Sequence, residues 1–332
     1  MKMITVEEHI VSEEIVNKTM ELQNVDMDEE RMEFFRKRAM VDGKLTEVEN
    51  YRLPFMDKTG VDIQILSYVN LNTEGLESDE RLKLCMEANN FLKEQVDKHP
   101  DRFAAFACLP LWDVEASCME LERCVKDYGF KGALVQGKFE GHFLDEKIFY
   151  PVFEKAAELD VPIHFHPSMP VQEIHNYYYT SHDGSWSEEV ANEFGTAALG
   201  WHLDIGIQVI RMILTGIFDK LPNLKFITGH WGEGMIELLD RMDYMMPKSI
   251  TGLNKNISEY YKEHMYVTPS GIESPINLEA VTKYMGADHI IWAVDYPFLM
   301  NETVVDFLMS SDLTDEEKEL ISHKNAEKLF KM

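Results

Sequence analysis

Acidic and imidazole side chains stand in this sequence where short apolar runs end. Near the C-terminus, the run Ile290–Val294 is followed at once by Asp295, Tyr296 and Pro297. Proline cannot donate to a strand ladder, so we expect a short buried strand to stop here. Asp295 then stands at the carboxyl end of that strand, which is where barrel and open α/β enzymes carry their active sites.

Other predicted strands end in residues of the same kind. Glu7 and His9 follow the first apolar run, and His166 ends a later one. Residues two apart in a strand point to the same side, so Glu7 and His9 can share one face. If the strands meet at one mouth, four candidate ligands converge there: Glu7, His9, His166 and Asp295. Two imidazoles and two carboxylates suit one divalent ion, Zn²⁺ or Mn²⁺. Each residue alone is more often a solvated or packed side chain, and it is their joint placement that favours a metal site.

His164 shares a strand with His166 but lies deeper. It could act as a ligand, but we interpret it as packed or hydrogen-bonded, and count it among residues on the substrate side.

A glycine-rich motif, Gly229–Gly234, follows the sixth apolar run and contains His230 and Glu233. Its three glycines permit a tight turn and the close approach of a ligand to the backbone. Glu233 could fix the tautomer of His230 and raise its basicity. The alternative is a structural histidine in a glycine-rich loop. Arg241, on the helix that follows, would by default be a solvated charge.

Apolar runs alternate with amphipathic helical stretches along the whole chain. The runs expected to form strands are 4–6, 61–67, 103–109, 132–136, 161–166, 224–228, 265–268 and 290–294. This alternation predicts an α/β protein with parallel strands and helical crossovers, and eight units in 332 residues fit a closed (β/α)8 TIM-like barrel. An open doubly wound sheet is the alternative, but Glu7-Glu8-His9 lacks the glycines of its phosphate-binding turn.

We expect a single domain over residues 1–332, with a helical insertion at about 12–58 after the first strand. A long helix is predicted at 188–218. The polar and aromatic segment at 167–187 reads as an irregular loop, and loops of this length inside a compact domain usually serve function.

Composition excludes several classes of partner. The formal net charge is -27 and the isoelectric point is near 4.8, so the surface repels nucleic-acid phosphates and anionic membranes. There is no run of about 18 uninterrupted apolar residues, the length that a membrane span needs. We therefore expect a cytoplasmic protein with no nucleic-acid or membrane partner.

With these motifs in hand, the sequence resembles the amidohydrolase superfamily, in the branch called amidohydrolase family 2. That branch includes aminocarboxymuconate-semialdehyde decarboxylase, and the nearest resemblance is to the γ-resorcylate and 2,3-dihydroxybenzoate decarboxylases. The resemblance covers nearly the whole chain. It rests on the following stretches: Glu7-Glu8-His9, His164-Phe165-His166-Pro167, Gly229-His230-Trp231-Gly232-Glu233 and Asp295-Tyr296-Pro297.

The resemblance implies roles for individual residues. Its metal ligands fall on Glu7, His9, His166 and Asp295, its active-site histidine on His230, and that histidine's partner on Glu233. It also makes Arg241 a structural or substrate-side candidate. The binuclear members carry His-x-His on strand one and a lysine on strand four; here Glu-x-His and Gln136 stand in those places, which implies one metal ion. Relatives of this kind are homodimers or homotetramers.

The implied reaction is non-oxidative decarboxylation of a small aromatic, hydroxybenzoate-type carboxylic acid. Asp295 is the candidate proton donor to the ring carbon, and His230 would bind a substrate oxygen or relay the proton. The alternative is a mononuclear metal-dependent hydrolase of a lactone, ester or amide, in which the same site activates water. A third reading is a catalytically silent barrel that binds a partner.

Overall fold

Seven of the expected strands form two parallel sheets. The computed structural model describes residues 1–22, 43–69, 71, 73, 75–139 and 141–332. Its strands are β1 (Ile4–Ile10), β2 (Ile63–Tyr68), β3 (Phe103–Ala105), β4 (Ala133–Gln136), β5 (Lys138–Phe139), β6 (His142–Phe143), β7 (Ile163–His166), β8 (Phe226–Thr228) and β9 (Met265–Val267). One sheet has the order β1-β2-β3 and the other β4-β7-β8-β9. The hairpin β5-β6 is antiparallel and was not expected from the sequence.

Regular pairing does not run round a closed barrel. An isolated bridge between Ala107 and Ala133 links the two sheets at one side. On the other side, the predicted eighth strand at 290–294 forms only isolated bridges, one from Ile290 to β9 and one from Ala293 to β1. Side chains form hydrogen bonds with part of its backbone: Asn325 donates to the Ile290 carbonyl, and Glu8 accepts from the Val294 N–H. The prediction of a regular strand at 290–294 was therefore wrong in detail.

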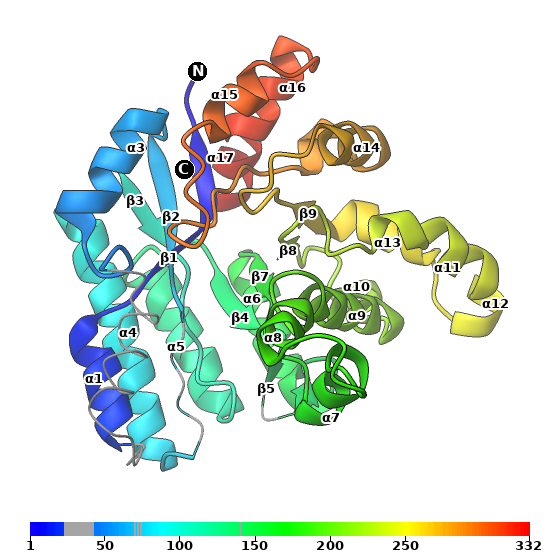
Figure 1. Cartoon of the computed structure of the whole chain (residues 1–332), viewed down its shortest axis with the longest axis horizontal. Coiled ribbons are helices and arrows are strands. Elements are labelled where there is room, and N and C mark those ends of the chain that lie inside the picture. The colour runs from blue at the N-terminus through cyan, green and yellow to red at the C-terminus, as the bar shows by residue number, and fades with distance from the viewer. Residues whose placement is uncertain (23–42, 70, 72, 74, 140) are drawn as a thin grey trace.

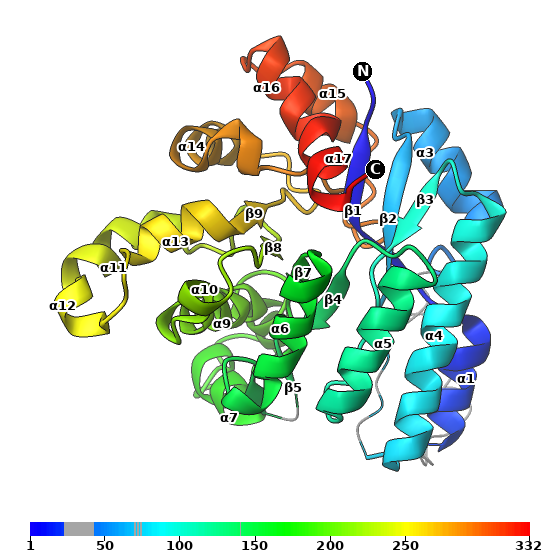
Figure 2. The ribbon, with the colours of Figure 1, turned by 180° about the vertical axis from the view of Figure 1, so that it is seen from behind.

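Helices surround the strands, and the two ends of the chain lie side by side (Figures 1 and 2). The longer helices are α1 (Glu13–Leu22), α4 (Ser78–Lys98), α5 (Val114–Lys126), α6 (Tyr150–Leu159), α8 (Glu188–Gly195), α9 (Gly200–Leu214), α13 (Ile257–His264) and α14 (Pro275–Met285). The shorter ones are α3 (Leu53–Thr59), α7 (Gln172–Ile174), α10 (Ile217–Lys220), α11 (Leu239–Met245), α12 (Lys248–Thr251), α15 (Val304–Met309), α16 (Asp315–Glu319) and α17 (Asn325–Phe330). Short 3-10 and π turns are η1 (Val48–Arg52), η2 (Lys147–Phe149), η3 (His175–Tyr179), η4 (Ile236–Leu238), η5 (Ala287–His289) and η6 (Leu320–Lys324).

One predicted helical region is described only in part, and another differs from expectation. Of the insertion predicted at 12–58, the structure describes α1, η1 and α3, and residues 23–42 lie outside the described part. The helix predicted at 188–218 is broken between α8 and α9, where Gly195 and Gly200 approach so closely that a β-carbon on Gly200 would lie 2.2 Å from the Gly195 carbonyl oxygen. In the described residues, the combined stretch Glu188–Leu214 is long and apolar enough to cross a membrane, but 44% of its most apolar window is buried in the protein. A core helix meets the same criterion.

Side chains inside the strands form a small core of their own. Ile4, Val6, Ile65, Phe106 and Ile227 belong to it, and all are fully buried. The helix α17 closes this core from one end, because the Phe330 ring packs edge-on against Phe106 at 5.6 Å between centroids. A larger core lies between the strands and the outer helices.

Truncating the Phe330 side chain should destabilise the protein without altering the candidate metal ligands at the carboxyl ends of the strands. Phe330→Ala removes a ring that is 3% exposed, so we expect a loss of about 3 kcal/mol in the free energy of unfolding. Urea denaturation measures it. Ile148→Ala is the matched control, since Ile148 is 63% exposed and should change stability by less than about 0.5 kcal/mol. Equal stabilities for the two variants would contradict the packing role of Phe330.

Candidate metal centre and active site

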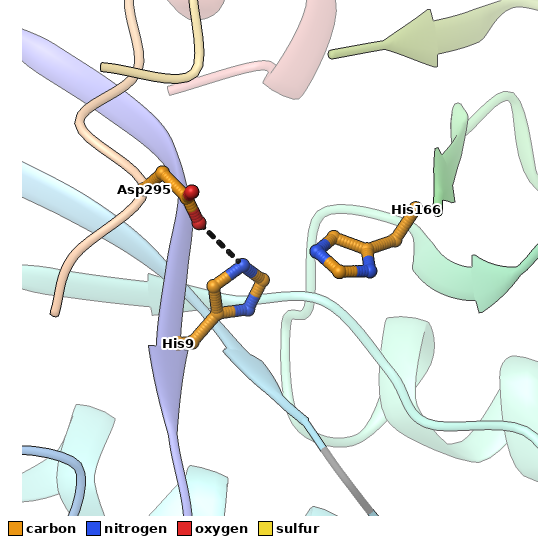
Figure 3. A group of neighbouring side chains, drawn as sticks. All are labelled: His9, His166 and Asp295. Atoms are coloured by element: carbon orange, nitrogen blue, oxygen red, sulfur yellow. Dashed lines mark ion pairs between the residues drawn. The ribbon is translucent and has the colours of Figure 1, made fainter. Parts of the chain in front are cut away.

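Three of the four predicted metal ligands converge at the carboxyl ends of the strands. His9 Nε2 lies 3.1 Å from Asp295 Oδ1, and the rings of His9 and His166 are 4.8 Å apart and nearly perpendicular (Figure 3). One potential ligand atom from each residue lies within 4.8 Å of the others. β1, β7 and the segment after Val294 supply them, so side chains far apart in sequence meet at one mouth.

Neighbouring groups aim these side chains. Ser67 Oγ lies 3.1 Å from His9 Nδ1, and the Pro167 carbonyl oxygen lies 2.9 Å from His166 Nδ1. With each Nδ1 engaged, the Nε2 atoms are the ones left to bind an ion. His9 Nε2 and Asp295 Oδ1 are buried and have no hydrogen-bond partner among the described residues. An imidazole nitrogen and a carboxylate oxygen left unsatisfied in this way, with the His166 imidazole beside them, fit a divalent cation.

The fourth predicted ligand, Glu7, lies nearby but outside this group. Its Oε2 accepts hydrogen bonds from the Thr268 and Ser270 hydroxyls, after β9. Its Oε1 is buried with no hydrogen-bond partner among the described residues. The β1–β2 register shifts between Thr5 and Glu8, and this irregularity places Glu7 at a positive φ of 64°. The structure therefore leaves one Glu7 oxygen available, but does not gather it with the other three ligands.

Burial prepares the ligand groups for a cation. It lowers the pKa of His9 to about 4 and holds the pKa of His166 well below the ordinary range, so both rings are neutral at neutral pH, the form that binds metal. It raises the pKa of Asp295 to about 7, although the positive charges of His230 and His202 oppose the rise. Burial raises the pKa of the Glu7 carboxyl as well.

His230 and Glu233 form the pair expected from the sequence, and a third residue joins them. His230 Nδ1 lies 2.9 Å from Glu233 Oε1, and His202 Nδ1 lies 2.8 Å from Glu233 Oε2. The two imidazole rings are 4.3 Å apart. Ser270 fixes the loop, because its Oγ accepts from the His230 backbone N–H at 2.8 Å. One carboxylate thus orients two imidazoles at the mouth.

His230 and Glu233 form an ion pair across most of the pH range. Burial lowers the pKa of His230, but the charge of Glu233 and its hydrogen bond outweigh this and raise the pKa to about 10. Burial likewise opposes ionisation of Glu233, yet His230 and His202 bring its pKa down to about 2. At neutral pH, His230 therefore carries a positive charge and can donate from Nε2.

Several backbone positions at this mouth are strained. Left-handed φ values between 44° and 64° occur at non-glycine residues of the site: Glu7, His230, Trp231, Glu233, Ser270 and Asp295. Each such residue costs on the order of 1–3 kcal/mol, and residues of this kind cluster at functional sites. The hydrogen bond from the Trp231 N–H to the Thr268 carbonyl, 2.8 Å long, helps to hold the loop after β8 in place.

The two predicted substrate-side residues are not in the ligand group. His164 is fully buried, with Nε2 4.0 Å from Glu7 Oε2, and neither ring nitrogen has a hydrogen-bond partner among the described residues. Arg241 is exposed on α11 and does not line the cavity.

A cavity of about 910 Å³ opens onto the ligand group. His166, His202, His230 and Asp295 line one part of it. Its remaining wall is mixed, with apolar and aromatic residues such as Leu71, Phe139, Trp201 and Phe298, and with polar residues Gln136, Lys138, Ser168 and Asn277. This size and character suit a small organic ligand.

Behind β1 lies a buried network that the sequence reasoning missed. Arg52, fully buried, donates to the His9 carbonyl and to Gln64 Oε1, and its guanidinium stacks 4.4 Å from the Tyr296 ring. Gln64 donates to Glu8 Oε2 at 2.9 Å. The network therefore touches residues next to both His9 and Asp295. The missed signal was Glu8, a charged residue in an otherwise buried strand.

His202 and the hydroxyls of Thr268 and Ser270 were also missed. His202 lies on a stretch read as one long helix, and nothing in its spacing pointed to the site. Thr268 ends the seventh apolar run and Ser270 follows it, and polar residues at a strand end were the available signal.

Imidazoles and a carboxylate gathered at the carboxyl ends of parallel strands define a class of metal-dependent α/β enzymes. Residues 41–332 match the model of the amidohydrolase family, described as Amidohydrolase, and the chain belongs to that family.

Relatives with described activities cover most of the chain. Decarboxylase orsB of Emericella nidulans is 32% identical over 297 residues, which are 87% of this chain and 87% of the relative. γ-Resorcylate decarboxylase of Polaromonas sp. is 32% identical over 304 residues, 87% of this chain and 89% of the relative. The solved dihydroxybenzoic acid decarboxylase from Polaromonas sp. JS666, with bound manganese and the inhibitor 2-nitroresorcinol, has a TM-score of 0.84 at 29% identity and covers 99% of this chain and 97% of that chain.

Metal binding should depend on pH through Asp295. Because its carboxyl must lose a proton to act as a ligand, Mn²⁺ affinity should fall roughly tenfold per pH unit below about pH 7. Calorimetry in two buffers of different ionisation enthalpy should show proton release near pH 6 that disappears near pH 8. Asp97→Asn, at a surface carboxylate, should keep the same profile. An affinity that stays constant over this range would refute the role of Asp295.

Removing the Glu233 charge should lower the pKa of His230. Glu233→Gln removes the largest charge that opposes burial, while Glu7 and Asp295 still oppose it, so the pKa of His230 should fall from about 10. Nitrogen-15 NMR titration of the imidazoles measures this change. Glu237→Gln, at an exposed residue on η4, is the control and should leave the His230 resonances unchanged. A His230 pKa that stays near 10 without Glu233 would show that the pairing does not raise it.

Proposed function

We propose that the protein is a metal-dependent, non-oxidative decarboxylase of a small hydroxybenzoate-type carboxylic acid. The observation that carries this is the convergence of His9, His166 and Asp295 beside the charged His230. His166, Asp295 and His230 line the cavity. The relatives support the reaction class, since those reported above are decarboxylases by name.

The ion would be Zn²⁺ or Mn²⁺, and His9, His166 and Asp295 would hold it, with Glu7 as the proposed fourth ligand through its unsatisfied Oε1. When bound, it would supply Lewis-acid polarisation and a fixed point for the substrate's carboxylate and a neighbouring hydroxyl. His164, buried with its Nε2 4.0 Å from Glu7 Oε2, would help to hold the Glu7 side chain in position. The exposed position of Arg241 on α11, away from the cavity lining, argues against direct substrate contact.

Asp295 is the proposed proton donor. Its carboxyl proton forms the new C–H bond at the ring carbon that bears the carboxylate. The bond from that carbon to the carboxylate then breaks, its electron pair restores the aromatic ring, and CO2 leaves. Burial raises the pKa of Asp295 to about 7 before a cation binds. With one carboxylate oxygen on the ion, the other oxygen would carry the proton. His230, held by Glu233, would donate a hydrogen bond to a substrate oxygen and stabilise negative charge that builds up on the ring.

We infer further that the two sheets belong to one (β/α)8 barrel over residues 1–332, with a helical insertion between β1 and β2. The isolated bridges between the sheets support this arrangement.

A homodimer or homotetramer is the proposed assembly, supported by apolar side chains exposed around α11 and α12: Tyr244, Met245 and Ile250. Light scattering tests it. The acidic composition supports a cytoplasmic location.

The reaction is tested by product and by variant. The Mn²⁺-loaded protein should release CO2 from hydroxybenzoates, and Asp295→Asn and His230→Asn should each lower kcat by at least about a hundredfold with circular dichroism unchanged. His142→Asn, at an exposed histidine, is the control and should keep full turnover. Acid production from a lactone or ester panel, without CO2 release, would favour the hydrolase instead. Near-wild-type turnover in Asp295→Asn would overturn its role.

A further inference from the structure

A fully buried arginine lies behind the strand that carries His9. Arg52 is the last residue of η1, in the insertion between β1 and β2, and its side chain is fully buried. It donates to a backbone carbonyl and to an amide oxygen rather than to a carboxylate. Burying a guanidinium on neutral partners costs free energy, and burial lowers the pKa of Arg52 to about 10. The decarboxylation steps above do not use this residue.

The hydrogen bonds of Arg52 lead to the backbone on two sides of the metal centre. One guanidinium nitrogen donates to the His9 carbonyl. Another donates to Gln64 Oε1 at 2.9 Å, and Gln64 Nε2 donates in turn to Glu8 Oε2 at 2.9 Å. The second oxygen of Glu8 accepts from the Val294 N–H at 3.1 Å. Arg52, Gln64 and Glu8 therefore form a buried series of hydrogen bonds, the Arg52 network, between β1 and the segment at 290–294.

The same arginine also contacts the residue after Asp295. Its guanidinium lies 4.4 Å from the ring centroid of Tyr296, and the His9 N–H donates to the Tyr296 carbonyl at 2.7 Å. Val294, on the other side of Asp295, is held by the Arg52 network. The backbone is thus fixed at His9 and on both sides of Asp295.

Asp295 depends on such support, because its backbone is strained. Its φ of 64° is a left-handed value, which is unfavourable for a residue with a side chain. Such a conformation persists only where surrounding contacts hold it. If those contacts were lost, the backbone of Asp295 would relax, and its carboxylate would move relative to His9.

The spacing of the two side chains is that of two ligands on one ion. His9 Nε2 and Asp295 Oδ1 lie 3.1 Å apart (Figure 3). Zn²⁺ binds nitrogen and oxygen atoms at about 2.0–2.2 Å, so two neighbouring ligand atoms lie about 3.0–3.5 Å from each other. A movement of either backbone segment would take one ligand atom out of bonding distance.

We propose that Arg52 is a positioning residue, which fixes the spacing of His9 and Asp295 and thereby sets the affinity of the centre for its divalent cation. The insertion after β1 thus serves the metal centre through one buried side chain. This inference rests on the metal binding in the proposed function and is independent of which acid is the substrate.

Calorimetry with Mn²⁺ alone, on the full chain at pH 8, measures this role. Arg52→Met removes every donor, and Arg52→Lys keeps the charge but lacks the fork that reaches both His9 and Gln64. Arg52→Met should weaken Mn²⁺ binding by about 10- to 100-fold, the usual effect of losing a group that orients a metal ligand, and Arg52→Lys should weaken it less. Gln64→Met cuts the connection to Glu8 but leaves the contact with His9, so its affinity should lie between those of the wild type and Arg52→Met.

Phe330→Ala separates positioning from stability. It truncates a buried ring in the core that α17 closes, so it should lower the stability but leave the Mn²⁺ affinity within about twofold of the wild type. Urea denaturation of each variant gives its loss of stability, so affinities can be compared between variants of similar stability. If Arg52→Met does not fold, Arg52→Lys and Gln64→Met decide.

Wild-type affinity in folded Arg52→Lys and Gln64→Met would overturn the positioning role, as would an equal loss of affinity in Phe330→Ala or a wild type that binds no Mn²⁺. Failure of the decarboxylase function looks different. The wild type would then bind Mn²⁺ but release no CO2 from hydroxybenzoates, and weakened Mn²⁺ binding in the Arg52 variants would still support the positioning role.

Discussion

Buried carboxylates at the strand ends are the constraint on which this structure depends. Glu7 and Glu8 are fully buried in one strand, and Asp295 joins them from the other end of the sequence. Burying several carboxylates together is costly unless positive charge or hydrogen bonds compensate. Glu8 accepts a hydrogen bond from Gln64, which in turn accepts one from Arg52. Glu7 and Asp295 are compensated by the charge of His230, the hydroxyls after β9 and a cation. Elements from four regions of the chain must therefore meet at this mouth.

The sequence predicted the order and direction of most strands, because runs of buried apolar residues and helical periodicity are local signals. It failed where tertiary contacts decide. The segment at 290–294 is apolar enough for a strand, but Asn325 and Glu8 bind backbone groups that a ladder would use. The helix predicted at 188–218 is broken by contact between two glycines, which helical periodicity does not reveal.

The grouping of the candidate site residues could be predicted where metal-binding or acid–base side chains stand at strand ends. His9, His166, Asp295 and the His230–Glu233 pair were found because their residue types stand out after apolar runs. The exact position of Glu7 was not, since a shift in strand register turns it towards Thr268 and Ser270. His202 and Arg52 come from helical segments whose orientation only the packed fold determines, so no pattern along the chain could have placed them.

The left-handed residues at the mouth set stability and activity against each other. Glycine would adopt those backbone angles with little strain, but it could not supply the carboxylates and imidazoles found there. A population selected for heat resistance alone would therefore gain by losing these side chains, and one selected for turnover would keep them. Laboratory evolution that selects for both properties should accordingly draw its stabilising changes from the helices and the opposite end of the fold, and leave these strand-end residues unaltered.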